Sequence, residues 1–217
     1  FWGGATLDAV REMGRATVGD PSLPTESEET AAILFTSGST GSPKGAVYTH
    51  GIFAAQVAAL RDSFGIKAGE IDLPTFPLFA LFAPALGITA VIPEMDFTRP
   101  GSVEPGRVLE PIRRFGATTM FGSPALLDRI SRVRLSETEA LPTLKRVICA
   151  GAPVAPKILE RFAKLLGSTA EILSPYGATE SLPVSVIGHR EILGETRALT
   201  EQGQGLCVGK PLPGLRV

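Results

Sequence analysis

The sequence predicts an α/β protein with a mostly parallel sheet flanked by helices. Short apolar segments alternate with longer segments in which apolar residues recur every three to four positions, the pattern of strands alternating with helices. Hydrophobic residues make up 44% of the 217 residues and charged residues 20%, which favours a packed core over a disordered chain. A formal net charge of −1 excludes the broad basic surface that non-specific nucleic-acid binding requires.

The N-terminal part of the chain carries signals for helix, linker, strand, strand and helix. The apolar stretch AAILFT is expected to be a buried strand, and Thr49 or His50 to cap the helix that follows the second strand. The five elements are expected over residues 1–14, 15–29, 31–36, 46–49 and from 49 onward.

The centre of the chain continues the alternation. Val108, Leu109 and Ile112 mark one face of a helix, and Ser123-Pro124 has the sequence of an N-cap followed by a first helical residue. We expect helices over 107–115, from 124 and over 155–166, and strands over 117–121, 145–150 and 170–173.

Residues 76–92 (FPLFALFAPALGITAVI) are uncharged and could be mistaken for a membrane span. The stretch has 17 residues, whereas a span needs about 20 and Pro77 and Pro84 would interrupt its helix. We therefore expect a buried loop and strand at the centre of the domain, and no transmembrane segment.

Cysteine and histidine are rare in this sequence. Two cysteines exclude a disulfide-stapled scaffold and suit a reducing cytoplasm, where we expect the protein to be located. Cys149 is expected in the core, His50 at a helix start and His189 at the surface. Phe1 and Val217 fall in segments without start or stop signals, so the chain is interpreted as the middle of a longer protein.

The segment Thr36–Gly45 (TSGSTGSPKG) carries the strongest chemical signal. Glycines let successive backbone N–H groups converge on phosphate oxygens, hydroxyls add donors, and Lys44 adds a positive charge. It is not a Walker A loop, because Pro43 and Gly45 flank the lysine and a strand follows. The alternative is a flexible Gly/Ser turn with an exposed lysine, which the flanking apolar strands make the weaker interpretation.

Two further segments follow predicted strands, at the edge where parallel sheets bind ligands. SPYGATES (174–181) offers an aromatic face, a hydroxyl and a carboxylate that could bind magnesium. AGAP (150–153) offers small residues that permit close approach to a flat ring. Taken alone, the first could be a surface turn and the second a plain strand-to-helix turn.

Together these segments resemble the adenylate-forming superfamily, which includes acyl-CoA synthetases, luciferases and peptide-synthetase adenylation domains. Thr36–Gly45 matches the family's TSGxTGxPKG loop, Tyr176–Glu180 its YGxTE signature and Gly151–Pro153 its adenine turn, and GKPLPG (209–214) is similar to its GxPxPG segment. The resemblance covers essentially the whole chain. It implies that the chain is the central part of the family's large N-terminal domain.

The resemblance also implies a role for each matched residue. Lys44, Thr179 and Glu180 would be catalytic, with Glu180 binding Mg²⁺, and Tyr176 would stack on adenine. The ATP-binding set would comprise Thr36, Ser37, Gly38, Ser39, Thr40, Gly41, Lys44, Gly151, Ala152, Pro153, Tyr176, Gly177 and Thr179. The implied cofactors are ATP and Mg²⁺, with CoA as a further possibility.

Domain boundaries follow from the same resemblance. Residues 1–30 would end a preceding lobe and form a linker, 31–200 would form the ATP-binding α/β subdomain, and 201–217 would begin a β-rich segment. The family's ribose-binding aspartate and small C-terminal domain with its catalytic lysine lie outside this chain, so we expect the chain alone to be incomplete for catalysis.

The implied reaction is ATP-dependent adenylation of a fatty acid with release of pyrophosphate. Ala80 follows Pro77-Leu78-Phe79 where long-chain acyl-CoA synthetases commonly have histidine, and this departure favours olefin-biosynthesis ligases, in which an adenylated 3-hydroxy acid closes to a β-lactone. The alternatives are a long-chain acyl-CoA synthetase and a non-catalytic nucleotide-binding module. Contacts with other enzymes of a lipid pathway are a further expectation.

Overall fold

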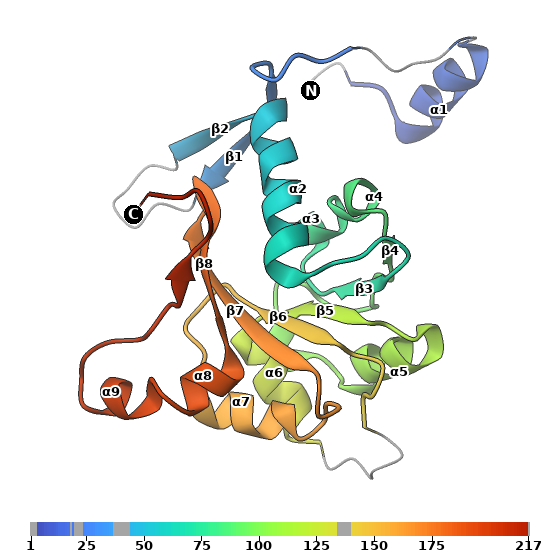
Figure 1. Cartoon of the computed structure of the whole chain (residues 1–217). Coiled ribbons are helices and arrows are strands. Elements are labelled where there is room, and N and C mark those ends of the chain that lie inside the picture. The colour runs from blue at the N-terminus through green and yellow to red at the C-terminus, as the bar shows by residue number, and fades with distance from the viewer. Residues whose placement is uncertain (1–3, 18, 20–23, 37–43, 134–139, 217) are drawn as a thin grey trace.

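A seven-stranded, mostly parallel sheet forms the centre of the molecule, as predicted (Figure 1). The computed structural model of the chain describes residues 4–17, 19, 24–36, 44–133 and 140–216. In the order β4-β3-β5-β6-β7-β8-β9, the first five strands are parallel and the last two antiparallel. Their bounds are β3 (Ile71–Pro74), β4 (Thr89–Ala90), β5 (Thr119–Gly122), β6 (Arg146–Cys149), β7 (Glu171–Ala178), β8 (Ser181–Gly188) and β9 (Lys210–Pro211).

The main hydrophobic core lies on one face of this sheet. Alternate strand residues such as Leu73, Met120 and Val147 point to this face and are fully buried. Ser123 accepts a hydrogen bond from the Leu126 backbone N–H at 3.3 Å, so the predicted helix N-cap is confirmed. The helices here are α5 (Gly106–Phe115), α6 (Pro124–Ser131), α7 (Pro156–Ala163) and α8 (His189–Leu193), with η1 (Pro100–Ser102) and α9 (Arg197–Glu201) at the periphery.

Helix α2 (His50–Phe64) covers the opposite face together with α4 (Ala83–Leu86) (Figure 1). The hydroxyl of Thr49 accepts from the Ile52 N–H at 3.2 Å, and Gly65 ends the helix in the left-handed region, with φ of 59°. Leu60 and Phe64 pack on Leu86 beneath the helix. This second core is smaller than the first.

The strands β1 (Thr30–Thr36) and β2 (Lys44–Thr49) form a separate antiparallel ribbon. The expectation that the first of them is buried is wrong within this chain, because Phe35 is 73% and Ile33 53% exposed. The two strands pair only with each other among the described strands, and none of the described helices covers these side chains. Helix α1 (Leu7–Ala16), capped by Thr6, also exposes the apolar face predicted from its spacing.

The apolar segment 76–92 does not form the buried loop and strand that the sequence favoured. It forms α3 (Pro77–Ala80) and α4, each with proline in its first turn, followed by the two-residue strand β4. Leu78 and Leu81 are more than half exposed because these helices lie at the rim of the sheet. Among the described residues, no helix is both long and apolar enough to cross a membrane.

The two cysteines and His189 test the remaining side-chain predictions. Cys149 is buried as expected, and burial raises its thiol pKa to about 12. His189 is buried, so its predicted surface position is wrong: its Nδ1 accepts a hydrogen bond from the Ile172 N–H at 3.1 Å. Burial, followed by the charge of Arg190, lowers the His189 pKa.

Candidate functional site

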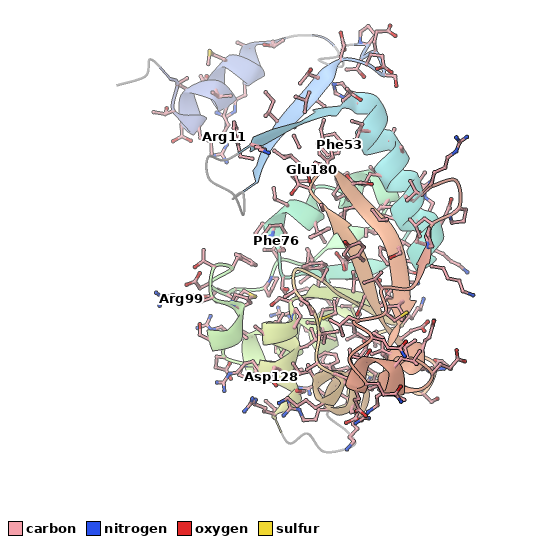
Figure 2. All side chains as sticks on the ribbon, turned by 90° about the vertical axis from the view of Figure 1, so that its left-hand side faces the viewer. Arg11, Phe53, Phe76, Arg99, Asp128 and Glu180 are labelled. Atoms are coloured by element: carbon pink, nitrogen blue, oxygen red, sulfur yellow. The ribbon has the colours of Figure 1, made fainter. Side chains whose placement is uncertain are left out.

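The segment 174–181 lies in a β-hairpin. Strand β7 continues past its parallel pairing with β6 and pairs with β8 as far as Ala178, so Tyr176 and Gly177 are strand residues. Thr179 and Glu180 form the turn at its tip (Figure 2). The expectation of a loop directly after a short strand is therefore wrong for Tyr176 and Gly177, because β8 supplies hydrogen-bonding partners that extend the strand.

At two positions of the site the backbone conformation or its close surroundings require glycine. A Cβ on Gly177 would lie 2.5 Å from the Ser181 carbonyl oxygen, so any side chain would open the hairpin. Gly151, which follows β6, has φ of 95°, a conformation that residues with a side chain rarely adopt. Both residues belong to the set predicted from the sequence.

Two side chains fix the hairpin from the side of β2 and α2. The Tyr48 hydroxyl donates to the Thr179 carbonyl oxygen, and the Gln56 Nε2 donates to the Leu182 carbonyl oxygen at 2.8 Å. One bond is made to a residue of the turn and the other to a residue just after it. They also connect the strand that begins at Lys44 with the turn that carries Thr179 and Glu180.

Sequence reasoning did not identify Tyr48 or Gln56. The available signal was that the chain has only two tyrosines, of which Tyr176 lies within a predicted nucleotide-binding segment and Tyr48 lies just after another. Burial raises the pKa of Tyr48, a hydrogen bond with Gln56 opposes this, and the negative charge of Glu180 adds to it. Tyr48 therefore stays a neutral hydrogen-bond donor beside the turn.

Cavities flank the segment Gly151–Pro153 and the hairpin. One, of about 410 Å³, is lined by Gly151, Gly177 and Thr179, together with Ser123 at the start of α6. A second, of about 450 Å³, is lined by Ala152, Pro153 and Tyr176. Tyr176 is 55% exposed, so its ring is accessible to a flat ligand group. The structure thus brings the second and third predicted segments together.

A small apolar pocket beneath α2 lies next to the first cavity. The cavity and the pocket share Phe79, Phe121 and Ala150, and also Pro175 and Leu182. Phe79 and Phe121 stack with their ring centroids 4.2 Å apart. The cavity at the carboxyl ends of the strands thus adjoins a smaller apolar pocket under α2.

The remaining predicted residues are Lys44, Thr36 and the loop between them. Lys44 begins β2 and pairs with Thr36 in the ribbon. Ser37, Gly38, Ser39, Thr40 and Gly41 lie outside the described residues. Glu180 is exposed at its turn and contributes one carboxylate, which fits the way Mg²⁺ is commonly bound, by one or two carboxylates together with phosphates and water. Within the described part of the chain no cluster of three His, Cys, Asp or Glu could hold a metal by itself.

Comparison with known proteins identifies relatives of the whole arrangement. An olefin beta-lactone synthetase of Stenotrophomonas maltophilia is 53% identical over 96% of this chain, which spans 37% of that protein. A long-chain-fatty-acid–CoA ligase of Thermus thermophilus is 28% identical over 92% of the chain and 38% of the ligase. The crystal structure of VinN superposes with a TM-score of 0.71 at 20% identity, covering 95% of this chain and 49% of VinN.

The family assignment is consistent with the geometry of the site. The model of one family, described as AMP-binding enzyme, matches residues 5–217. That range contains β1, β2, the β7–β8 hairpin and the segment after β6, which are the elements that carry the predicted nucleotide-binding residues. The chain belongs to the family of AMP-binding enzymes.

Proposed function

We propose that the protein containing this chain adenylates a fatty acid. The acid's carboxylate would attack the α-phosphorus of ATP, forming acyl-AMP and releasing pyrophosphate. The observation that carries this proposal is that the cavity at Gly151 and Thr179 and the apolar pocket beneath α2 share five lining residues. An acid bound at this junction would have its carboxylate at the nucleotide and part of its hydrocarbon chain against apolar side chains.

Each residue near the cavity has a role in this proposal. Lys44, at the start of β2, would neutralise the phosphates, and the Thr179 hydroxyl would donate to a phosphate oxygen. Tyr176 would stack on adenine against Gly151–Pro153. Tyr48 and Gln56 would position the turn without touching the nucleotide. Glu180 would hold Mg²⁺, which supplies charge neutralisation at the phosphates when it is bound.

The finer substrate proposal is a long-chain 3-hydroxy acid. The relative with 53% identity is named an olefin beta-lactone synthetase, and Ala80 leaves more space beside Phe79 than a histidine would. In the lactone step the 3-hydroxyl oxygen forms a bond with the acyl carbon, the bond to the AMP phosphate breaks, and the hydroxyl proton leaves with AMP or to solvent. This step consumes no thiol.

A CoA thioester is the second candidate product. The observation that favours it is the 28% identity with a long-chain-fatty-acid–CoA ligase over 92% of the chain. A non-catalytic module is disfavoured, because Lys44, Thr179 and Glu180 are all present. We further propose a cytoplasmic location and contacts with neighbouring enzymes of lipid metabolism.

Mass spectrometry of the full-length protein's products tests these proposals. The protein is incubated with ATP, Mg²⁺ and a 3-hydroxy fatty acid, with and without CoA. Adenylation predicts pyrophosphate in both mixtures, and lactone closure predicts release of AMP and the same product mass with and without CoA. Accumulation of thioester would favour the CoA ligase as the function, and the absence of pyrophosphate would contradict adenylation.

A further inference from the structure

A large, mostly apolar groove lies beside the first half of α2. Its walls come from the β1–β2 ribbon, from α2, from the segment 76–85 and from the β7–β8 hairpin. Phe53 of α2 and Phe76 just before α3, both labelled in Figure 2, belong to these walls. The groove has about 690 Å³, whereas the pocket beneath α2 has about 50 Å³. Of the two spaces, the groove has the volume of a typical ligand site, about 300–1,000 Å³.

The groove adjoins the cavity that is lined by Gly151 and Thr179. Phe76, Phe79, Thr179 and Leu182 line both spaces. A molecule that extends from the nucleotide past Thr179 therefore enters the groove. The acid has a second and larger space for the part of its chain that the small pocket does not hold.

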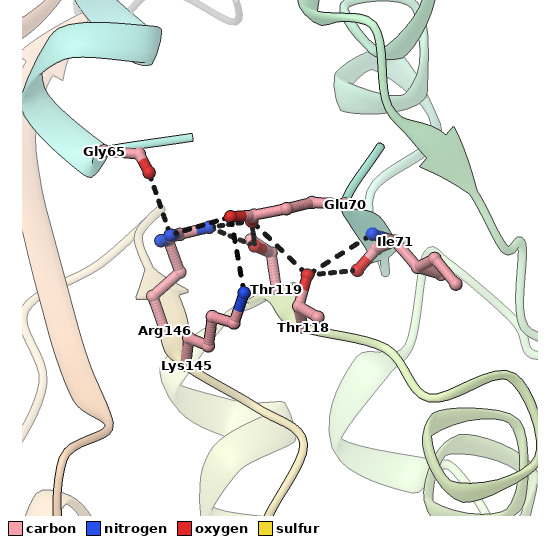
Figure 3. A network of polar contacts seen from close by, with 7 residues as sticks. All are labelled: Gly65, Glu70, Ile71, Thr118, Thr119, Lys145 and Arg146. Atoms are coloured by element: carbon pink, nitrogen blue, oxygen red, sulfur yellow. Dashed lines mark hydrogen bonds and ion pairs between the residues drawn. The ribbon is translucent and has the colours of Figure 1, made fainter. Parts of the chain in front are cut away.

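Polar groups make the small pocket unsuitable for the rest of the chain. Its lining includes Asp72, which is 8% exposed and whose Oδ1 has no hydrogen-bond partner among the described residues; burial raises the pKa of Asp72 to about 7. Thr119, which pairs with Asp72, belongs to a network in which Arg146 also contacts Glu70 and Gly65 (Figure 3). A methylene group packed here would leave the buried Oδ1 unsatisfied.

The groove, in contrast, exposes large apolar side chains to water. Phe35 and Leu81 are 73% exposed, and Leu78 is 52% exposed. All three line the groove, whereas the described lining of the cavity does not include them, so they lie away from the nucleotide. Contiguous exposed apolar surface marks binding sites, and a hydrocarbon chain placed on it removes apolar surface of both partners from water.

The polar side chains of the groove gather at its end beside the hairpin. Among the described residues that line it, Tyr48, Gln56 and Thr179 carry polar side chains. The Tyr48 hydroxyl donates to the Thr179 carbonyl oxygen, and a hydrogen bond also joins Tyr48 to Gln56. The groove is therefore polar beside the nucleotide and apolar beyond it, which matches an acid with a polar end and a hydrocarbon tail.

Gln56 has an unused acceptor at this polar end. Its Nε2 donates to the Leu182 carbonyl oxygen at 2.8 Å, which fixes the orientation of the amide. Its Oε1 is buried and has no hydrogen-bond partner among the described residues. An unsatisfied acceptor costs free energy, so a ligand hydroxyl that donates to it gains affinity. The terminal torsion of glutamine is broad, and a small rotation turns Oε1 toward the groove.

We infer that this groove binds the acyl chain of the substrate and that Gln56 recognises the 3-hydroxyl group of that chain. The inference rests on the proposed adenylation and deepens it by placing both ends of the acid. The 3-hydroxyl oxygen lies at most about 4 Å from the carboxyl carbon, given C–C bonds of about 1.5 Å. It therefore stays at the polar end when the carboxylate lies beside Thr179, and the tail covers Leu78 and Leu81.

The role of Gln56 is tested with dodecanoic and 3-hydroxydodecanoic acids as substrates of the full-length protein. Pyrophosphate release gives kcat/KM for each acid, and we expect the hydroxylated acid to be preferred about tenfold, the effect of one satisfied hydrogen bond. Gln56→Met should abolish this preference. Tyr48→Phe removes the other side-chain bond to the hairpin but keeps Oε1, so it should slow both acids alike and leave their ratio unchanged.

The position of the tail is tested with 3-hydroxyoctanoic and 3-hydroxydodecanoic acids. Each methylene that the groove covers should raise kcat/KM about two- to fourfold, the transfer effect of a partly or fully buried CH₂. Leu81→Ser should lower the advantage of the longer acid by about three- to tenfold. Leu199→Ser is the matched control, because Leu199 is an exposed leucine of α9 that does not line the groove.

The outcomes separate this inference from the proposed function. An unchanged hydroxyl preference in Gln56→Met, or no such preference in the unmodified protein, would overturn the role of Gln56. An unchanged length dependence in Leu81→Ser would overturn the binding of the tail in the groove. Pyrophosphate release would support adenylation in each of these cases, whereas its absence with every acid would contradict adenylation itself. Thermal melting checks that each variant folds, and Gln56→Ala replaces Gln56→Met if methionine does not fit.

Discussion

The sheet face under α5, α6 and α7 holds fully buried apolar side chains such as Leu73, Met120 and Phe162, whereas the face under α2 holds Asp72, the Glu70–Arg146 pair and an open pocket. Both faces are built from the same strands, because successive residues point to opposite sides. Leu73 and Asp72 are adjacent in sequence and serve different faces. The first face buries apolar side chains and stabilises the fold. The second face also buries polar groups and leaves an unfilled pocket.

Truncation of a large side chain should give the largest difference in unfolding free energy between the two faces. Phe162 of α7 is fully buried, so Phe162→Ala should cost about 3–5 kcal/mol of unfolding free energy. Phe82, at the pocket, is only partly buried, and Phe82→Ala should cost less while changing the selectivity for the acid substrate. Urea denaturation of both variants measures the difference, and equal costs would contradict the contrast.

The buried ion pair gives the next largest effect. Burial raises the pKa of Glu70, but the hydrogen bond and charge of Arg146, the charge of Lys145 and the Thr118 hydroxyl outweigh it, so the pKa is lowered. Glu70→Gln should cost about 1.5–3 kcal/mol near pH 7. The lowered pKa gives Glu70 a stabilising contribution that is complete above its ordinary value of 4.5 and is lost as the pH falls below it. The two proteins should therefore converge in stability at acid pH, and a difference that is independent of pH would contradict this assignment.

Asp72 should show the opposite pH dependence. With a pKa of about 7 in the folded state and 3.8 ordinarily, it binds more protons when folded, so stability falls as the pH rises from 4 to 7. Asp72→Asn removes this loss and should be more stable than the unmodified protein near pH 7 by about 1–3 kcal/mol. Denaturation at pH 4 and pH 7 measures the change, and a gain that is equal at both values would count against a neutral Asp72.

Removal of a helix cap should have the smallest effect on stability, and one cap is available on each face of the sheet. Ser123 caps α6 on the apolar face and Thr49 caps α2 on the pocket face, each with one hydrogen bond to the helix backbone. Substitution of either by alanine should cost about 1 kcal/mol. Thr49→Ala should also slow pyrophosphate release, because it loosens the junction between Tyr48 and Gln56. Unchanged pyrophosphate release by Thr49→Ala would argue against that coupling.

The apolar face could be predicted from sequence because its signals are local. Helical spacing identified Val108, Leu109 and Ile112, and Ser123-Pro124 marked a helix start. The exposure of β1 could not be predicted in this way. It depends on what packs against the ribbon, and the apolar residues of the strand itself do not reveal that.

Most of the described candidate site residues lie close together in the structure, but the sequence did not indicate the side chains that connect them. Gly151, Tyr176, Gly177, Thr179 and Glu180 lie around shared cavities or on one hairpin. The contacts of Tyr48 and Gln56 with that hairpin join residues more than 120 positions apart, a separation at which no spacing rule applies. His189 was misplaced for the same reason, since its partner Ile172 lies on another element.

ATP–pyrophosphate exchange in the full-length protein tests most directly whether the β1–β2 ribbon and the β7–β8 hairpin serve a nucleotide site. Lys44→Ala should lower the exchange rate about 10- to 150-fold, because a charge-assisted hydrogen bond to phosphate contributes about 1.5–3 kcal/mol. Lys67→Ala, at an exposed position before β3, is the control and should leave the rate unchanged. Equal exchange by Lys44→Ala and the unmodified protein would contradict the assignment of Lys44 to ATP binding.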